Sequence, residues 1–371
     1  MNAGNSDYTR IAVKVGSNVL TRADGTLDVT RMSALTDQIA DLRKRGTEVI
    51  LVSSGAVAAG RSELCPSCKL DSVAERQLFS AVGQAKLINR YYTLFREHGI
   101  TVGQVLATKE SFSTRRHYLN QRACMEVMLQ NKVLPVVNEN DTVSVTELMF
   151  TDNDELSGLI ATMMNVQVLI ILSNIDGIYS GQPSAPESRL LREIAPDEDL
   201  SAYICREKSG FGRGGMLTKT RIARKVASEG IEVWIANGKR EHILTDLFDH
   251  PETPCTRFVP SQETASSIKK WIAHSDSFCK GEIYLNEEAS RRLTDGQVAS
   301  ILPIGITQVK GDFEKDDLIR ITGFDGQSIG IGKADCDAAT AYTEMGCKDK
   351  KAVVHYDFLY IDTPLKDKTQ P

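Results

Sequence analysis

The chain has 371 residues, of which 41% are hydrophobic and 25% charged, which is typical of a soluble globular protein and leaves room for two domains. No apolar run approaches the roughly 20 residues of a membrane-spanning helix, and the polar N-terminus lacks the apolar core of a secretory signal. The formal net charge is -5, without the basic excess of an electrostatic nucleic-acid binder. We therefore expect a cytoplasmic protein that has no membrane contact and is unlike a nucleic-acid binder.

Up to about residue 238, short apolar runs alternate with segments of helical length. The runs predict strands at Ile11–Val15, Val49–Val52, Val102–Leu106, Val133–Val137, Val168–Leu172 and Val233–Ala236. The segments between them predict helices at Val29–Arg45, Val73–His98, His117–Asn131, Glu155–Asn165 and Met216–Gly230. Most runs are apolar at nearly every position, as strands buried on both faces of a parallel sheet are. The alternation predicts an α/β domain, with a mostly parallel sheet sandwiched by helices and a ligand crevice at the strand-to-helix turns.

The pattern changes after residue 250. The segment PETPCTRFVPS, which begins at Pro251, holds three prolines and is typical of a linker, and a short helix is expected around Ile268–Ile272. Short strands follow, with Gly-containing turns between them, and they predict a small, mainly β barrel-like domain. The strands are expected at Glu282–Leu285, Val298–Leu302, Ile306–Val309, Leu318–Thr322 and Ala352–Val354. From Asp276 onward there are 12 Lys and Arg against 17 Asp and Glu, so this part is acidic.

Two of the predicted strands end in small residues. VKVGSNVL places Lys14 within the first strand and Gly16, Ser17 and Asn18 directly after it. A turn of small residues lets backbone N–H groups approach an anion, and the lysine can neutralise phosphate, although a surface lysine beside an ordinary turn has the same pattern. No GKS or GKT sequence occurs, which excludes a Walker A loop. LVSSGAVAAG similarly runs from a strand into the start of a helix. Its Ser and Gly residues can either cap the helix or expose N–H groups that bind an anion.

Polar residues gather at two further strand and helix ends. PVVNENDTVSV ends an apolar strand on Asn138, Glu139, Asn140 and Asp141. Such groups are costly in an apolar strand unless they are paired, but at its carboxyl end they can point into the crevice. In FTDNDELSGLIA, Asp152 and Glu155 fit a capping box, which leaves Asn153 and Asp154 without a structural explanation.

The segment GFGRGGMLTK combines a glycine-rich loop with Lys219 in the first turns of a helix. The helix dipole disfavours a lysine there, so we expect Lys219 to meet a negative ligand. Two lysines could grip a transferring phosphoryl group, and a carboxylate acceptor would need no general base. No Ser-His-Asp or Cys-His set stands out, and the lone pair Cys65 and Cys68 lacks partners for a zinc site, so we predict no protein-held metal.

In this order, VKVGSNVLT, VSSGAVAAGR, AVGQAKLI, VNENDTV, DNDELSGLIA and GGMLTK resemble the glutamate 5-kinases of the amino acid kinase family. The tail, with GEIYLNEEA, ILPIGITQVKGDF and GKADCDA, resembles a PUA domain. The resemblance implies an amino acid kinase domain at residues 1–258, a linker at 259–276 and a PUA domain at 277–365. It also implies that ATP, with Mg²⁺, phosphorylates the γ-carboxylate of L-glutamate in the first step of proline biosynthesis.

The resemblance also implies roles for individual residues. The catalytic residues would be Lys14, Lys219 and Asp154, with Asp154 positioning the two lysines. ATP would be bound by Lys14, Gly16, Ser17, Ser173, Asn174, Arg213, Gly214, Gly215, Met216, Leu217, Thr218 and Lys219. Glutamate would be bound by Ser54, Gly55, Ala56, Asn138, Asp141 and Asn153.

The chain departs from the family pattern in the nucleotide region. Ser173-Asn174 stands where Thr-Asp is common, and Arg213 and Leu217 replace a threonine and a serine, so that Arg213 either touches phosphate or faces solvent. Two alternatives stay open: a kinase of another carboxylate, such as aspartate or N-acetylglutamate, and RNA binding through the PUA domain. The resemblance further implies feedback inhibition by proline, a homodimer or homotetramer, and hand-over of the product to glutamyl phosphate reductase.

Overall fold

The computed structural model describes residues 8–64, 70–113, 115–143, 153–181, 187–196, 198, 216–262, 272, 279–295, 297 and 299–361. It divides into two compact units, Met1–Thr108 with Leu119–Thr264 and Lys109–Tyr118 with Ala265–Pro371. Within these described ranges, no helix combines the length and the apolar character needed to cross a membrane.

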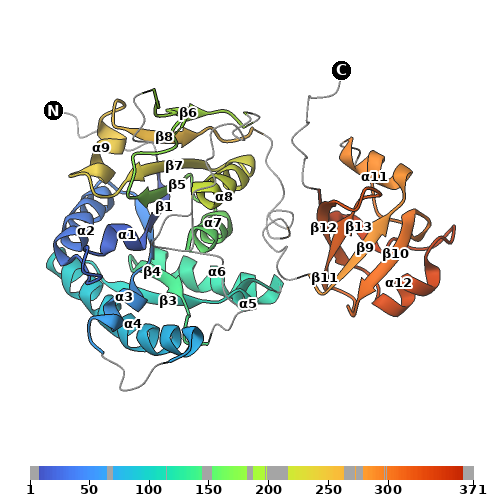
Figure 1. The fold of residues 1–371 in the computed structure, drawn as a ribbon, viewed down its shortest axis with the longest axis horizontal. Coiled ribbons are helices and arrows are strands. Elements are labelled where there is room, and N and C mark those ends of the chain that lie inside the picture. Colours follow the sequence, from blue (N-terminus) through green and yellow to red (C-terminus); the bar gives the residue numbers. More distant parts are fainter. Residues whose placement is uncertain are drawn as a thin grey trace. The chain divides into compact units, whose positions relative to one another are not determined.

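The first unit is built on an eight-stranded sheet with the order β3-β4-β2-β1-β5-β7-β8-β6 (Figure 1). Its strands are β1 (Arg10–Val15), β2 (Glu48–Ser53), β3 (Val102–Ala107), β4 (Leu134–Glu139), β5 (Val168–Ser173), β6 (Glu193–Ile194), β7 (Glu232–Asn237) and β8 (Cys255–Phe258). All neighbouring strands run parallel except β7 and β8, which are antiparallel. The carboxyl ends of β1, β2, β4 and β5 therefore meet at one edge of the sheet.

Helices cover both faces of this sheet (Figure 1). They are α1 (Ser17–Leu20), α2 (Val29–Lys44), α3 (Ala56–Arg61), α4 (Ser72–Glu97), α6 (Arg115–Gln130), α7 (Asn153–Met163), α8 (Met216–Ser228) and α9 (Ile243–Asp249). The short helix α5 (Glu110–Ser113) falls within the residues grouped with the second unit. The helices α2, α4 and α9 share one hydrophobic core with the inner strands, and α6, α7 and α8 lie on the other face. Side chains cap two of the longest helices, because Asp28 accepts a hydrogen bond from Arg31 N and Asp71 accepts from Val73 N.

The predicted α/β architecture is confirmed, and the six predicted strands and five predicted helices lie within about two residues of their expected positions. The prediction of a linker from Pro251 was wrong in part, because Cys255–Phe258 forms β8 and pairs with β7. Pro254 and Pro260 lie just outside this strand, where they remove no ladder hydrogen bond. Strand β4 also runs beyond its predicted end at Val137, through Glu139.

The second unit holds a separate five-stranded sheet with the order β10-β9-β11-β12-β13, antiparallel except between β9 and β11. Its strands are β9 (Gly281–Leu285), β10 (Ile306–Gly311), β11 (Leu318–Thr322), β12 (Ser328–Ala334) and β13 (Val354–Ile361). The helices α11 (Glu287–Thr294) and α12 (Ala338–Glu344) and the short 3-10 helix η2 (Pro303–Gly305) complete the unit. Buried side chains such as Ile283, Phe313 and Ile319 form its own core.

Two strand predictions for this unit need correction, and one predicted helix lies mostly outside the described residues. Of the strand predicted at Val298–Leu302, the described residues 299–302 form no strand: among them only Ile301 makes an isolated bridge, with Val354, before the chain enters η2. The strand predicted at Ala352–Val354 begins only at Val354 and continues to Ile361. Of the helix expected at Ile268–Ile272, only Ile272 belongs to the described residues.

Candidate active site

Two lysines and one aspartate meet at the carboxyl edge of the large sheet. Lys14 lies in β1, Asp154 is the second residue of α7, and Lys219 is the fourth residue of α8. The Lys14 Nζ lies 2.5 Å from Asp154 Oδ1, and the Lys219 Nζ lies 3.0 Å from Asp154 Oδ2. The Lys14 and Asp154 side chains are only 6% and 1% exposed. A single buried carboxylate thus holds two ammonium groups, one on each oxygen.

The electrostatics of this trio favour an anionic ligand. Burial alone would raise the pKa of Asp154, but the charges of Lys14 and Lys219 and their hydrogen bonds outweigh burial and lower it. The carboxylate is therefore ionised at neutral pH, and the trio carries two positive charges and one negative charge. Two lysine ammonium groups fixed side by side attract phosphate and carboxylate groups.

Gly16 lets the end of β1 approach β5 beside Lys14. Its backbone N donates a hydrogen bond to Leu172 O at 3.1 Å. A Cβ atom at this position would lie 3.1 Å from the same carbonyl oxygen and 3.6 Å from Lys14 Nζ. A side chain would therefore crowd both the strand end and the ammonium group. Ser17 follows as the first residue of α1.

The end of β2 and the start of α3 form a second polar corner. Gly55 caps α3 with a φ of 101°, a left-handed conformation that glycine adopts without strain. The Asn153 Nδ2 donates to Ser54 Oγ at 2.9 Å and to Asn138 Oδ1 at 3.2 Å. Three residues expected to bind substrate, from the end of β2, from β4 and from α7, thus lie in contact. Ala56, the first residue of α3, is buried beside them.

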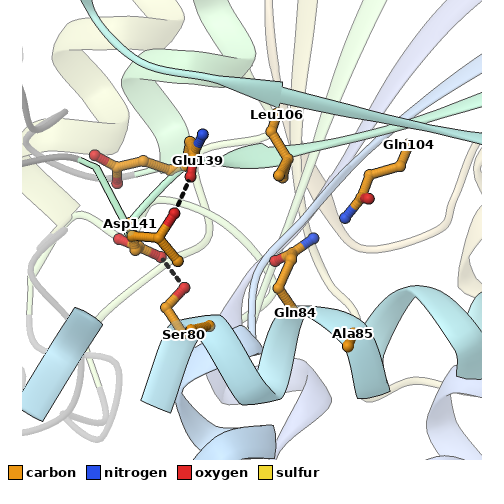
Figure 2. Close-up of a pocket in the computed structure, with 10 residues that line it drawn as sticks. Ser80, Gln84, Ala85, Gln104, Leu106, Glu139 and Asp141 are labelled. Carbon is orange, nitrogen blue, oxygen red and sulfur yellow. Dashed lines mark hydrogen bonds between the residues drawn. The ribbon is translucent and has the colours of Figure 1, made fainter. Parts of the chain in front are cut away.

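A row of polar residues on α4 contacts the end of β4, and the sequence prediction missed it. Arg76 Nη2 lies 2.9 Å from Glu139 Oε2 and also forms an ion pair with Asp141. Ser80 Oγ donates to Asp141 Oδ2 at 3.1 Å (Figure 2). Gln84 Oε1 accepts from Asn138 Nδ2 at 2.8 Å. Spacing of four residues places all three on one helix face, and this periodicity of polar residues was the available signal.

A cavity of about 210 Å³ opens between α4 and the ends of β3 and β4 (Figure 2). Its lining is Ser80, Ala81, Gln84, Ala85, Gln104, Leu106, Glu139, Asn140, Asp141 and Thr142. Asp141 therefore borders an open space, although its side chain is only 8% exposed. Glu139 and Asn140, for which the sequence suggested no chemistry, also border it.

The two residues at and just after the end of β5 that were expected to bind ATP, Ser173 and Asn174, differ in their burial. Ser173 ends β5 and is buried, whereas Asn174 is exposed. The nearest following carboxylate, Asp176, accepts two hydrogen bonds from Arg240, at 2.6 and 2.8 Å, and this arginine lowers the pKa of Asp176. Asp176 is therefore engaged in a structural ion pair and does not simply replace the carboxylate that Asn174 lacks.

Several residues expected at the site belong to segments outside the described ranges. Arg213, Gly214, Gly215, Asp152, Cys65 and Cys68 lie outside the described residues. Met216, Leu217 and Thr218 form the first turn of α8 together with Lys219, and Leu217 is 58% exposed. Among the side chains that the structure describes, no group of three or more His, Cys, Asp or Glu gathers as metal ligands would.

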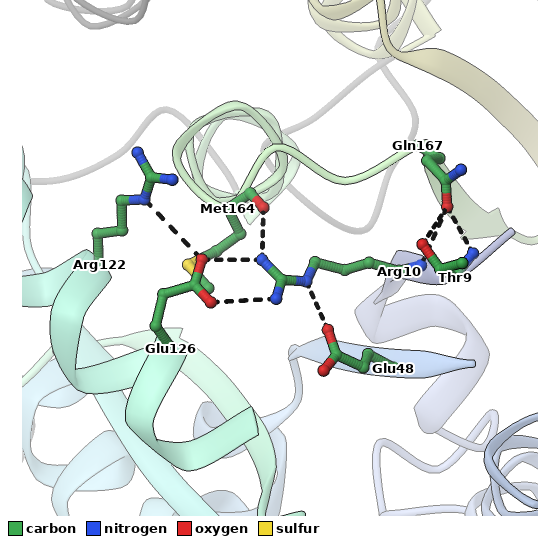
Figure 3. A network of polar contacts seen from close by, with 7 residues as sticks. All are labelled: Thr9, Arg10, Glu48, Arg122, Glu126, Met164 and Gln167. Carbon is green, nitrogen blue, oxygen red and sulfur yellow. Dashed lines mark hydrogen bonds and ion pairs between the residues drawn. The ribbon is translucent and has the colours of Figure 1, made fainter. Parts of the chain in front are cut away.

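The opposite, amino ends of the same strands carry a different polar network (Figure 3). Arg10, the first residue of β1, places its Nε 2.7 Å from Glu48 Oε2 in β2. Its two terminal nitrogens bind the two oxygens of Glu126 in α6, at 2.8 and 3.0 Å, and Nη1 also donates to Met164 O at 3.1 Å. This network joins two strands to α6 and to the end of α7, which suggests a structural role.

Replacing Arg10 with methionine should therefore lower stability and spare catalysis. Hydrogen bonds to charged groups contribute about 1.5 to 3 kcal/mol, and we expect a loss of unfolding free energy of about 2 kcal/mol. Urea unfolding would measure it. Arg61→Met is the matched control, because Arg61 and Glu75 form a surface pair with side chains 58% and 38% exposed and a contribution below about 1 kcal/mol. Equal losses in both variants would contradict the role given to Arg10.

Comparisons with known proteins agree with this geometry. The model of the amino acid kinase family matches residues 9–237, and the model of the PUA domain matches residues 281–355. A glutamate 5-kinase of Bacteroides thetaiotaomicron is 70% identical over 357 residues, which cover 96% of this chain and 99% of that protein. A glutamate 5-kinase of Chlorobaculum tepidum is 50% identical, over 95% of this chain and 98% of that protein.

Among solved structures, the carbamate kinase from Giardia lamblia bound to AMP-PNP matches with a TM-score of 0.51. The match covers 69% of this chain and all of that chain, at 16% sequence identity. At this identity the likeness shows a shared fold alone.

Proposed function

Because the chain belongs to the amino acid kinase family, we propose that it transfers the γ-phosphoryl group of ATP to the γ-carboxylate of L-glutamate. The product would be L-glutamyl 5-phosphate, and the reaction would be the first step of proline biosynthesis. Support for the substrate comes from two relatives named glutamate 5-kinase, at 70% and 50% identity over nearly the whole chain. The observation that carries the chemistry is the convergence of Lys14 and Lys219 on Asp154.

Each residue of the trio has a part in this reaction. Asp154 fixes the Lys14 and Lys219 ammonium groups on its two oxygens, so both point into the same space. A phosphoryl group in transfer spreads its negative charge over three oxygens, and fixed positive charges stabilise that state more than the ground state. The acceptor carboxylate is ionised at neutral pH and needs no base to remove a proton. Binding and alignment are thus most of the catalytic task.

The described residues fit the phosphates of ATP. The two lysines supply positive charge, and Gly16 keeps the end of β1 free of a side chain beside them. A magnesium ion bound with ATP would neutralise further phosphate charge. Magnesium in such sites retains water and phosphate ligands, which suits a part of the chain where no cluster of three acidic, histidine or cysteine side chains gathers.

The amino-acid end of the substrate would lie at the end of β4. The carboxylate of Asp141 would pair with the α-ammonium, and the amides of Asn138 and Asn153 and the hydroxyl of Ser54 would bind the α-carboxylate. An acetylated amine carries no positive charge to pair with Asp141, so the proposed contact disfavours N-acetylglutamate as the substrate. Ser54, Asn138 and Asn153 are joined directly by hydrogen bonds. Asp141 joins them through Arg76 and Glu139, which supports a single binding site.

We expect Asp141→Asn to raise the KM for glutamate by about tenfold or more, because a charged hydrogen bond is worth about 1.5 to 3 kcal/mol. The KM for ATP should change less than about twofold, since the nucleotide lies on the side of Lys14 and Lys219. Initial rates with each substrate varied in turn would measure both. Equal increases in the two KM values would show that Asp141 does not read the amino acid.

A screen of acceptors tests the proposal itself. ADP formation would be followed with glutamate, aspartate, N-acetylglutamate and UMP, each at the same concentration. Glutamate should give the highest kcat/KM. Preference for aspartate or N-acetylglutamate would favour the alternative substrates within the family. Salt-sensitive binding of tRNA to the second unit, with no ATP turnover, would favour the RNA-binding alternative.

Other expectations from the sequence stay predictions. They are the domain boundaries at residues 258 and 277, feedback inhibition by proline, a homodimer or homotetramer, cytoplasmic location and hand-over of the labile product to glutamyl phosphate reductase.

A further inference from the structure

We propose that Arg76, Ser80 and Gln84, the polar row on α4, position the residues that read the amino-acid end of the substrate. This inference rests on the proposed function and adds a specificity element to it. The row lies at every fourth position of one helix, and each member contacts a polar side chain at or just after the end of β4. In the reaction scheme, the three act through Asn138 and Asp141 and do not touch the reacting atoms.

Gln84 sets the direction of the Asn138 amide. Its Oε1 accepts a hydrogen bond from Asn138 Nδ2 at 2.8 Å, so the Asn138 Oδ1 points the other way. That oxygen accepts from Asn153 Nδ2 at 3.2 Å and from Glu139 N at 2.9 Å. Asn138 and Gln84 are both buried, where an unpaired amide is costly. The orientation of Asn138 is therefore specified by a residue of α4.

Arg76 and Ser80 fix the carboxylate of Asp141. The Arg76 guanidinium pairs with Asp141 and with Glu139, and Ser80 Oγ donates to the second oxygen of Asp141 at 3.1 Å. The carboxylate of Asp141 is thereby held with its negative charge at the border of the cavity. An incoming α-ammonium group would balance it, whereas a neutral or acetylated head would not. Arg76 also prevents the two carboxylates from repelling each other at close range.

The row is not needed to hold α4 in place. The helix buries Phe79, Leu87, Tyr91 and Phe95 in the apolar core. It also lies so close to α3 that a Cβ atom at Gly83 would fall 1.7 Å from Ala56 O. Apolar packing and this close helix contact account for the position of α4. The polar row therefore has a task other than docking the helix.

The test compares two ligands in the full-length protein with an unreactive ATP analogue bound. Glutamate has the α-ammonium, and glutarate is the same dicarboxylate without it. Calorimetry on Arg76→Met should give a Kd for glutamate raised by about tenfold or more, with the glutarate Kd changed less than about twofold. Arg76→Lys, which keeps the charge, should recover part of the loss. Lys86→Met is the control on the same helix, because Lys86 pairs with Glu63 at the surface, and it should change neither Kd.

Ser80→Ala removes a single oxygen atom and serves as a second variant that disturbs the fold little. It should lower the preference for glutamate over glutarate by about threefold. An equal loss of both ligands in these variants, or no loss of either, would overturn the inference while glutamate turnover by the wild type still supports the proposed function. Absence of glutamate turnover by the wild type would overturn the proposed function, and the inference with it.

Discussion

Replacing Lys14 with methionine should lower the kcat of glutamate-dependent ATP turnover by about 10²- to 10³-fold, the usual effect of removing one fixed donor from a transition state. Lys14 Nζ lies 2.5 Å from Asp154 Oδ1 at the carboxyl end of β1, where the phosphoryl group is proposed to pass. The KM for glutamate should change little, since the amino-acid head lies at the end of β4. Steady-state rates with both substrates varied would separate the two effects.

The fold should tolerate this change. Asp154 keeps its second partner, because Lys219 Nζ lies 3.0 Å from Oδ2, and methionine is close to lysine in length. Circular dichroism and urea unfolding would check that the variant is folded. Lys44→Met is the matched control, because Lys44 is exposed near the end of α2 and should leave kcat unchanged. A Lys14→Met enzyme with more than about a tenth of the wild-type kcat would exclude a direct contact with the phosphoryl group.

Asp154→Asn should damage both catalysis and stability. Lys14 and Lys219 would keep their charges and lose the carboxylate that fixes them, and misplacement of such groups by about 1 Å costs about 10²-fold in rate. Breaking a buried ion pair by removing one partner costs about 3 to 5 kcal/mol of unfolding free energy. ATP should recover part of this loss, since its phosphates return negative charge to the lysines. The midpoint of thermal unfolding, with and without ATP, would measure the recovery.

The stability effect of Asp154 should depend on pH in a defined direction. Its pKa is lowered below the ordinary value of 3.8, because the charges of two lysines outweigh burial. A group with a depressed pKa stabilises the folded state fully above its unfolded pKa, and this contribution is lost as the pH falls through its folded pKa. The gap between wild type and Asp154→Asn should therefore be widest above about pH 5 and should narrow in stronger acid. A gap that does not depend on pH would mean that the carboxylate is not the stabilising group.

Much of the fold was predictable because apolar runs and helical periods mark buried elements directly. The exceptions have physical reasons. Strand β8 sits between two prolines, and prolines outside a ladder look the same in sequence as prolines in a linker. Strand β12 was missed because Gly330 and Gly332 weaken its pattern, yet a Cβ atom at Gly332 would lie 2.4 Å from a Val354 side-chain atom. Close packing between strands thus requires glycine where propensity disfavours it.

Some residues of the candidate site could be predicted from the sequence, and others could not. Lys14, Asn138 and Lys219 stand out because each is a polar residue where the chain pattern calls for an apolar or neutral one, and Asp154 because the capping box leaves it without a structural explanation. Arg76 does not stand out, since an arginine in the first turns of a helix is usually solvated. Its importance depends on two carboxylates more than 60 positions later in the chain, which only the folded arrangement brings to it. Side chains that act through a partner from another element escape local patterns.

The identity of the trapped product tests the central claim most directly. The enzyme would be incubated with ATP, Mg²⁺ and L-glutamate in the presence of hydroxylamine, and the hydroxamate would be identified by mass spectrometry against α- and γ-glutamyl standards. Transfer to the γ-carboxylate predicts γ-glutamyl hydroxamate in an amount that equals the ADP formed. ADP without hydroxamate, or formation of the α-isomer, would contradict phosphorylation of the γ-carboxylate.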